Sequence, residues 1–389
     1  LDLPNGFDAV FEALDRRFPG SHGGLMRLKG MMLQTMASFS WYNLERMDPD
    51  ARHLNLHVSV KEVVDNLTAD PDLRQFLYML SWGTSLRPDV CPFGLFCMVN
   101  GSIIESAWRI EGGGGALVAA LVERFLELGG SLECESDVCR FEVDGMYVKS
   151  VETKEGGHFE GDLFIATPHP KTILEIAGPR AFRPTFRDMI EEFDDAPGSF
   201  LVFLELGTAP TSLKDTNNFL YGKNWDEGLY FISPSTMDRT FKGKHMLEIL
   251  SWMDFDRVAR WKGSKHGKRP PEYLKFKAEM SEKMVSRVRR VCPEIDGNIL
   301  NMDAATPLTN LHYTRSHGGA AMGVSQGVHQ QGIFHMRSRN KMRNLFFAGQ
   351  SVGTPGIMGT IITSYVLCDE ILGRGALWKR LTQGMGKGS

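Results

Sequence analysis

The sequence feature that most constrains the fold is an apolar run that ends in a glycine-rich turn before an apolar helix-like stretch. It occupies residues 346–364, FFAGQSVGTPGIMGTIITS, close to the C-terminus, and its turn contains Gly353, Pro355, Gly356 and Gly359. A glycine-rich turn that enters a helix exposes backbone N–H groups and the positive end of the helix dipole. The stretch therefore predicts a strand–turn–helix unit whose helix end attracts phosphate or another group on which negative charge develops.

Two interpretations of these glycines stay open. A flavin ring would need bare backbone at Gly356 and Gly359, because a planar ring must approach closely. On reduction, negative charge collects around its pyrimidine edge, and a helix N-terminus aimed there stabilises the reduced form. In the other interpretation the glycines only permit a tight strand-to-helix turn.

Residues 112–168 have the pattern of an α/β unit. A helix is closed by Gly129 and Gly130, because glycine accepts the left-handed backbone conformation found just past a helix end. Short strands follow, and then a fully apolar run that is typical of a buried strand. The expected strands are SLECES (131–136), VCRFEVD (138–144), YVKSVET (147–153) and DLFIATP (162–168).

Residues 181–335 have a different pattern, with strand candidates separated by turns and one long amphipathic helix, PEYLKFKAEMSEKMVSRVRRVCPEI. Because α/β character returns at the C-terminus, the sequence predicts a discontinuous α/β domain with a mostly antiparallel β domain inserted into it. Helical periodicity dominates from residue 7 to 80, with a break at Asp70-Pro71. The Met-rich segment 25–47 is either a buried helix or an amphipathic cover over an apolar pocket. The expected divisions are 1–108, 109–180, 181–335, 336–375 and a tail, 376–389.

Composition excludes several classes of protein. The net charge of −3 gives no field that would favour nucleic acid, and no apolar run is long enough to span a bilayer. The six cysteines include no C-x-x-C pair, so the sequence predicts no metal site and reduced, mostly buried thiols in the cytoplasm. The basic stretch 257–277 is either a solvated loop or a contact with an anionic membrane surface or an acidic partner.

Four blocks of the sequence, in this order, resemble the phytoene desaturase superfamily of FAD-dependent oxidoreductases, and its carotenoid isomerase and retinol saturase branch looks nearest. The blocks are GGGGALVAALVERFLELGGSLECESDVCRF, GDLFIATPHP, TPLTNLHYTRSHGGAAMG and NLFFAGQSVGTPGIMGTIITS. The resemblance implies a Rossmann-like FAD-binding domain, a substrate domain with an antiparallel sheet and a helical cover.

The resemblance also implies which residues contact FAD. Val138 would meet the adenine, and the end of the buried strand would pass beside the dinucleotide. Residues after the last strand would touch the pyrophosphate and ribityl chain, and the helix start would lie under the flavin pyrimidine. In order, these positions are Ala166, Thr167, Pro168, Gly349, Gln350, Gly356, Ile357, Met358 and Gly359.

The family's opening βαβ unit with its G-x-G-x-x-G motif, roughly thirty residues, has no counterpart in the sequence. The cluster Gly112–Gly115 fails that pattern because Leu117 stands where it requires glycine. Three explanations stay open: a truncated record, a separate polypeptide that carries the unit, or loss of FAD binding.

The resemblance implies hydride or electron transfer between flavin and a carbon–carbon bond of a polyene or prenyl-type lipid, in desaturation, saturation or isomerisation. His312, Tyr313 and His317 are the candidates for an acid or base near the flavin. An amine-oxidase-like flavoenzyme and a cofactor-free lipid- or partner-binding scaffold are the alternatives. A lipid substrate also implies a cytoplasmic protein in peripheral contact with a membrane.

Overall fold

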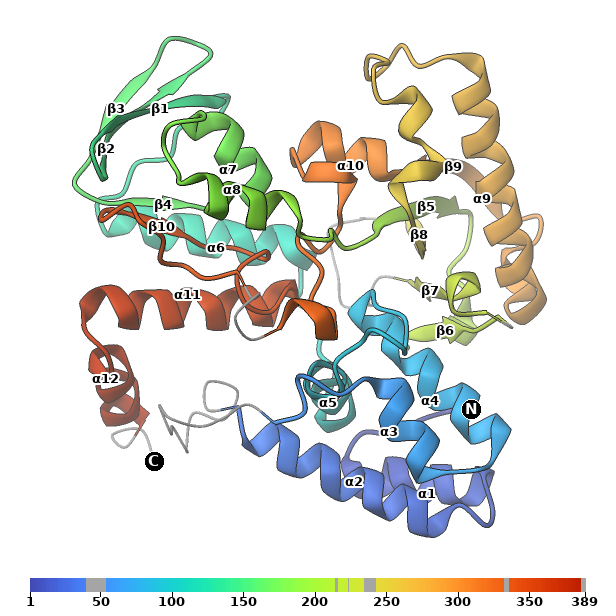
Figure 1. Cartoon of the computed structure of the whole chain (residues 1–389). Coiled ribbons are helices and arrows are strands. Elements are labelled where there is room, and N and C mark those ends of the chain that lie inside the picture. The colour runs from blue at the N-terminus through green and yellow to red at the C-terminus, as the bar shows by residue number, and fades with distance from the viewer. Residues whose placement is uncertain (40–53, 214–215, 223, 234–242, 332–335, 386–389) are drawn as a thin grey trace.

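The computed structural model describes residues 1–39, 54–213, 216–222, 224–233, 243–331 and 336–385, which form three adjoining units (Figure 1). The described residues among the first hundred form a helical unit, and the middle of the chain forms a sheet unit. The segments that precede and follow the sheet unit together form an α/β unit. The termini of the chain lie in different units, because the last helices belong to the α/β unit.

The described residues of the helical unit form five α-helices, whose boundaries follow from local capping. Ser59 accepts a hydrogen bond from the Glu62 N–H at the start of one helix, and Asp70 caps the next one ahead of Pro71. The break predicted at Asp70-Pro71 is therefore confirmed. The helices are α1 Phe7–Arg17, α2 His22–Ala37, α3 Val60–Leu67, α4 Pro71–Leu80 and α5 Phe93–Glu105.

The described part of the Met-rich segment is helix α2, which buries one face and exposes the other, where Leu33 is 42% exposed. Leu25, Leu28, Met32 and Met36 of α2 lie in the core of the helical unit. Residues 40–47 of that segment lie outside the described ranges.

The sheet unit is a five-stranded antiparallel sheet in the order β6-β7-β8-β5-β9. Helix α9, Pro271–Val291, packs against it through Tyr273, Met284, Val285 and Val288, which share one core with the central strands. The predicted antiparallel region is confirmed, with one further strand, β9, that the sequence analysis did not anticipate. The strands are β5 Gly198–Leu206, β6 Asn218–Leu220, β7 Leu229–Ile232, β8 His245–Met253 and β9 Ile299–Ala305.

The α/β unit joins segments that lie far apart in the sequence. Strand β4, Phe164–Ala166, pairs in parallel with β10, Leu345–Phe347, and a three-stranded antiparallel sheet lies beside this pair. The predicted α/β class and its discontinuous organisation are thereby confirmed. The other elements are α6 Gly113–Glu127, β1 Val138–Asp144, β2 Tyr147–Thr153, β3 His158–Glu160, α7 Pro170–Ala177, α8 Pro184–Glu191, α11 Gly356–Leu372 and α12 Ala376–Met385. Helix α10, Pro307–Tyr313, instead packs in the core of the sheet unit through Leu308.

One local prediction was wrong. The segment SLECES forms no strand, because the backbone after α6 turns at Gly129 and again at Glu135, both with positive φ. The described part of the expected tail contains helix α12, Ala376–Met385. In addition, α8 and its flanks pack with the α/β unit, since Phe182, Ile190 and Phe193 share a core with Phe347.

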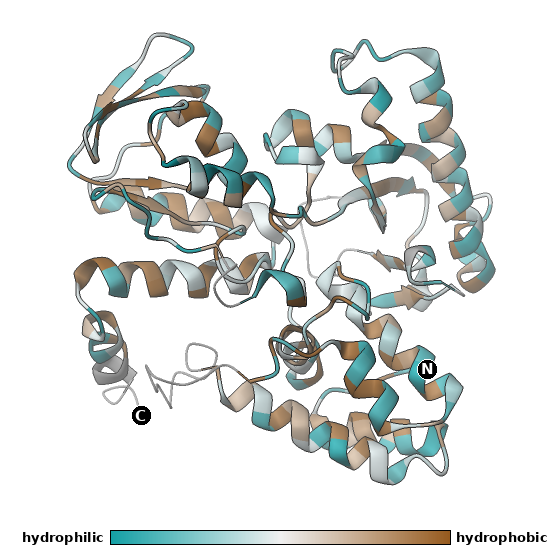
Figure 2. Cartoon of the chain, in the orientation of Figure 1, coloured by the Kyte–Doolittle hydropathy of each residue, from teal (hydrophilic) through white to brown (hydrophobic). Residues whose placement is uncertain are grey.

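Helix α6 is largely apolar (Figure 2), yet burial of its side chains is absent: none of its residues is buried in the described structure. Val118 and Leu121 are each 60% exposed, and Phe125 is 50% exposed. Apolar side chains are also exposed on β4 and α11. They are Ile165 on β4 and Ile357, Met358, Ile361, Tyr365 and Val366 on α11. The α/β unit therefore exposes apolar side chains on α6, β4 and α11.

Candidate functional site

The carboxyl ends of β4 and β10 bring together five of the predicted cofactor-binding residues. Ala166 lies beside Phe347, and the Ala348 N–H donates to the Ala166 carbonyl at 2.9 Å. A Cβ at Gly349 would lie 3.1 Å from the carbonyl oxygen of Thr167, so the two chain segments approach closely just beyond the strands. Thr167, Pro168, Gly349 and Gln350 therefore follow the strand ends directly. In open parallel sheets, this edge is where ligands bind.

The turn from β10 into α11 is tied down from two sides. The Val352 N–H donates to the Gly349 carbonyl at 3.1 Å, and the buried Ser351 hydroxyl accepts the Val324 N–H at 3.3 Å. A Cβ at Gly353 would lie 2.6 Å from Thr363 Oγ1, so helix and turn are in close contact. The turn is thus held rigidly at the strand ends.

The helix that follows begins with an open end. No side chain caps the N-terminus of α11, and Gly356, Ile357 and Met358 are exposed. Gly356 has φ +86°, a conformation that favours glycine, and nothing lies within 4 Å of a Cβ built there. The N–H groups of this first turn are accessible to a ligand.

The two glycines of the helix start have different roles. A Cβ at Gly359 would lie only 2.2 Å from the Thr354 carbonyl oxygen, so the turn itself requires this glycine. The packing interpretation therefore accounts for Gly359, whereas the open space beside Gly356 is compatible with an approaching ring.

Val138 lies apart from the strand ends, at the start of β1 in the three-stranded sheet. Its neighbour Asp137 accepts a hydrogen bond from Arg315 Nη2 at 2.8 Å and forms an ion pair with Lys154. The start of β1 is therefore tied to the turn after α10, between the predicted acid–base candidates Tyr313 and His317.

The structure separates those three candidates. His312 and Tyr313 end α10, where the His312 ring stacks on the His266 ring with centroids 4.3 Å apart, and Tyr313 is 68% exposed. Desolvation, and after it the charge of His266, lowers the pKa of His312, which favours the neutral imidazole. A neutral imidazole is a poorer proton donor than the protonated form that the sequence analysis considered.

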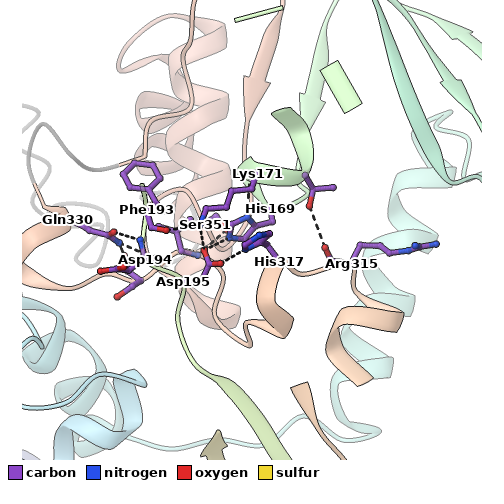
Figure 3. Close-up of polar contacts among 12 residues, drawn as sticks. His169, Lys171, Phe193, Asp194, Asp195, Arg315, His317, Gln330 and Ser351 are labelled. Carbon is purple, nitrogen blue, oxygen red and sulfur yellow. Dashed lines mark hydrogen bonds and ion pairs between the residues drawn. The ribbon is translucent and has the colours of Figure 1, made fainter. Parts of the chain in front are cut away.

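His317 belongs to a polar cluster that the sequence analysis missed (Figure 3). Its Nδ1 hydrogen-bonds Asp195 Oδ2 at 2.5 Å, and its ring stacks on that of His169 at 5.5 Å. Lys171 Nζ lies 3.5 Å from Asp195 Oδ1 and donates to the Phe193 carbonyl at 2.7 Å. The cluster joins α7, the linker before β5 and the turn after α10.

Two features of the sequence could have pointed to this cluster. His169 directly follows the predicted Pro168, and its Nδ1 accepts the Lys171 N–H as the N-cap of α7. Asp195 lies in the acidic pair that precedes β5, and nothing in the sequence alone indicates which of the two aspartates is buried.

The charge of Asp195 is held inside the protein by its neighbours. Burial alone raises the pKa of this carboxyl, but His169, His317 and Lys171 outweigh burial and hold the pKa below its ordinary value. His169 Nε2 lies 3.1 Å from Asp195 Oδ1, an ion-pair distance, although the angle is outside that of a well-formed hydrogen bond. Asp195 is therefore ionised at neutral pH.

Metal clusters and membrane-spanning helices are absent from the described ranges. No group of three or more histidine, cysteine or acidic side chains there is arranged to hold a metal ion. Each helix of those ranges is too short or too polar to cross a lipid bilayer. A cavity of about 220 Å³ lies between α2 and α3, and none of the predicted site residues lines it.

Comparison with known proteins relates this geometry to enzymes. No protein-family model matches the chain. The chain is 23% identical over 348 residues to all-trans-retinol 13,14-reductase of Danio rerio, a match that covers 81% of the chain and 57% of that protein. It is 28% identical over 156 residues to the Homo sapiens protein of the same name, covering 38% of the chain and 25% of that protein. The resemblance predicted from the sequence is confirmed. The chain nevertheless spans little more than half the length of the Danio rerio relative.

Solved structures with the same fold are oxidoreductases. Putrescine oxidase bound to putrescine has a TM-score of 0.61 at 13% identity, with 96% of this chain and 77% of that chain covered. An oxidoreductase from Methanosarcina mazei has a TM-score of 0.59 at 12% identity, covering 92% of this chain and 75% of that one. Cyclohexylamine oxidase from Brevibacterium oxydans has a TM-score of 0.57 at 12% identity, covering 95% and 79%. These similarities confirm the two-domain oxidoreductase fold.

Proposed function

We propose that this chain forms the substrate domain and part of the cofactor domain of an FAD-dependent oxidoreductase that reduces a carbon–carbon double bond of a polyene or prenyl-type lipid. The observation that carries the proposal is the similarity over 348 residues to a protein named all-trans-retinol 13,14-reductase. The strand ends and the open start of α11 support it, because they offer backbone donors where negative charge develops on a flavin. Desaturation or isomerisation of the same class of substrate would use the same site.

The residues present fit part of FAD. Val138 would meet the adenine, Ala166, Thr167 and Pro168 would lie beside the dinucleotide, and Gly349 and Gln350 would contact the pyrophosphate and ribityl chain. The first turn of α11, Gly356 to Gly359, would support the flavin pyrimidine. When bound, FAD would supply the hydride chemistry, and the chain would align an apolar substrate that offers no ionisable group.

A further α/β segment would complete the cofactor site. In the described ranges β4 pairs only with β10, so its outer edge is free, and the neighbouring α6 and α11 carry exposed apolar side chains. An unpaired strand edge flanked by such side chains favours the addition of a strand and its connecting helix. That segment would come from a longer form of this polypeptide or from a separate subunit.

This part of the proposal is tested by hydrogen exchange in two preparations, the 389-residue chain and the full product of the gene. The amide of Ile165 should exchange rapidly in the chain and slowly in the full product. A dye that fluoresces on apolar surface should bind the chain, and Leu121→Glu with Val118→Glu should weaken that binding without lowering the melting temperature. Equal Ile165 exchange in both preparations would contradict a strand supplied by a longer form of this polypeptide.

Activity is tested with all-trans-retinol as the probe, using the flavin-loaded full gene product and a chemical reductant of flavin. The expected result is a product that has gained two hydrogens, identified by mass spectrometry. Putrescine and cyclohexylamine, incubated aerobically, serve as probes of the amine-oxidase alternative that the structural neighbours favour. Oxidation of an amine without reduction of retinol would replace the proposed function by that alternative. A preparation that binds no flavin would support the scaffold interpretation.

Access to a lipid substrate would require contact with a membrane surface. Part of the basic stretch is folded, because Arg269 donates to the carbonyls of Trp261 and Ser264, whereas Lys262, Lys265 and Lys268 are exposed. Exposed lysines favour binding to an anionic bilayer. Flotation with vesicles that contain anionic lipid tests this contact, and protein that stays at the bottom of the gradient would contradict it.

A further inference from the structure

We propose that Asp195 positions His317 as the group that transfers a proton in the reaction, with the outer nitrogen of His317 directed to the substrate. This inference rests on the proposed function for its chemistry, but the contact between the two side chains can be tested without turnover. A carboxylate that orients an imidazole fixes which nitrogen carries the proton and leaves the other free to react.

The hydrogen bonds assign opposite tautomers to the two histidines of the cluster. His169 Nδ1 accepts the Lys171 N–H, so the proton of a neutral His169 lies on Nε2, toward Asp195. His317 Nδ1 faces Asp195 Oδ2, so a neutral His317 carries its proton on Nδ1. Its Nε2 therefore has a free lone pair, and among the described residues no side chain or backbone group bonds to it.

Exposure distinguishes the histidine that can react from the one that cannot. The side chain of His169 is 2% exposed and that of His317 is 42% exposed, although both contact the same carboxylate. His169 and Lys171 balance the buried charge of Asp195 from the inner side, while His317 meets solvent on the outer side. Arg315 is the nearest other cation on the same loop, and its charge is paired with Asp137.

The backbone around His317 holds the ring in place. Gly318 and Gly319 both have positive φ, and a Cβ at Gly319 would lie 2.1 Å from the Pro307 carbonyl oxygen. The Asn310 side chain donates to the Gly319 carbonyl at 3.2 Å. A tight turn thus follows the histidine, and His169 follows directly on Pro168 at the predicted dinucleotide strand. The imidazole is fixed next to the candidate cofactor site.

The proton balance of the reaction gives His317 its role. Saturation of one carbon–carbon double bond adds a hydride to one carbon and a proton to the other. A reduced flavin cofactor would supply the hydride. Protonated His317 would donate that proton from Nε2 and become neutral. Its Nδ1–H would stay hydrogen-bonded to Asp195 Oδ2. Solvent would then reprotonate Nε2.

The adjacent residue Asp194 provides a matched control. Its carboxylate contacts His329 Nε2 at 2.9 Å, and its side chain is 69% exposed. Asp194→Asn and His329→Gln therefore remove the same kinds of group, one residue away, from a solvated pair. Asp195→Asn and His317→Gln are the test variants, and Asp195→Glu is the rescue variant.

The tautomer of His317 is measured by two-bond proton–nitrogen NMR on protein with isotope-labelled histidine, with the signal assigned through His317→Gln. The expected result is an Nδ1–H tautomer for His317 and an Nε2–H tautomer for His169, the first altered in Asp195→Asn and unchanged in Asp194→Asn. An Nε2–H tautomer for His317 in the unaltered protein would overturn the proposal.

The catalytic arm uses all-trans-retinol with the flavin-loaded full gene product. General acid–base catalysis contributes about 10²- to 10⁴-fold, so His317→Gln should lower kcat at least about 10²-fold with little change in KM. Asp195→Asn should lower kcat less, and Asp195→Glu should restore most of it. Unchanged turnover in His317→Gln would overturn the proposal. An unaltered protein that does not reduce retinol would instead refute the proposed function, and the tautomer would still decide the Asp195–His317 contact.

Discussion

Replacing Asn344 should uncouple the three-stranded sheet from the strand that leads into the candidate cofactor turn. The Asn344 side chain takes the place of a strand: its Oδ1 accepts the Val148 N–H at 2.9 Å, and its Nδ2 donates to the Val148 carbonyl at 2.8 Å. Both residues are buried, with 8% and 1% of their surfaces exposed. In Asn344→Ala the Val148 N–H and carbonyl would therefore lose their partners in a site that water does not reach.

The expected loss of stability is about 2–6 kcal/mol, because two buried polar groups lose their partners and each group left unsatisfied costs about 1–3 kcal/mol. Asn344→Asp should cost at least as much, since it keeps one acceptor but places a carboxylate oxygen against the Val148 carbonyl. Urea unfolding measures the loss, and hydrogen exchange of the Val148 amide locates it. Asn301→Ala is the control, because it removes only an exposed side-chain bond to Glu205, and such surface changes stay within about 0.5 kcal/mol. An Asn344→Ala protein as stable as the control would refute this reasoning.

Three further predictions concern the thiols, the helix start and the buried carboxylate. A thiol reagent should modify the exposed Cys134, Cys139 and Cys368 rapidly. It should modify the other three cysteines only on unfolding, because these are buried and burial raises the pKa of Cys91 to about 12. Fast labelling of Cys91 would contradict the fold. Gly359→Ala should cost about 1–3 kcal/mol by overpacking against Thr354, whereas Gly115→Ala, which meets nothing within 4 Å in α6, should be neutral or stabilising in the same melting assay. Folding lowers the pKa of Asp195, so the ionised carboxylate stabilises the folded state above the ordinary carboxyl pKa of 3.8, and this stabilisation is lost as pH falls. The difference in unfolding free energy between the unaltered protein and Asp195→Asn should therefore narrow below that pH. A constant difference would contradict the ionised state.

The sequence predicted those features that local pattern controls. Capping at Asp70-Pro71 and the alternation in VCRFEVD set element boundaries that depend on a few neighbouring residues, and both agree with the structure. The meeting of β4 and β10 was also predictable, because two fully apolar runs each precede turn residues. The exposure of Cys134, Cys139 and Cys368 was not predictable in this way. The prediction of mostly buried thiols rested on composition and not on the position of each cysteine.

The polar cluster around Asp195 could not be predicted in the same way. Its members come from three segments, and neighbouring residues such as Asp194 and Asp195 have the same chemistry but opposite exposure. Only the return of the chain from β4 through α7 to the linker brings His169 beside Asp195. His317 stays a predicted site residue, and only the tertiary structure shows that Asp195 is its partner.

The most direct test of the central claim is the flavin content of the full gene product, measured as flavin released on denaturation and identified by chromatography. We expect stoichiometric FAD in the unaltered protein, a large loss in Gly356→Leu, where a side chain would enter the open space beside the helix start, and full retention in Gly115→Ala. A folded, colourless protein that takes up no FAD from an excess in solution would contradict it.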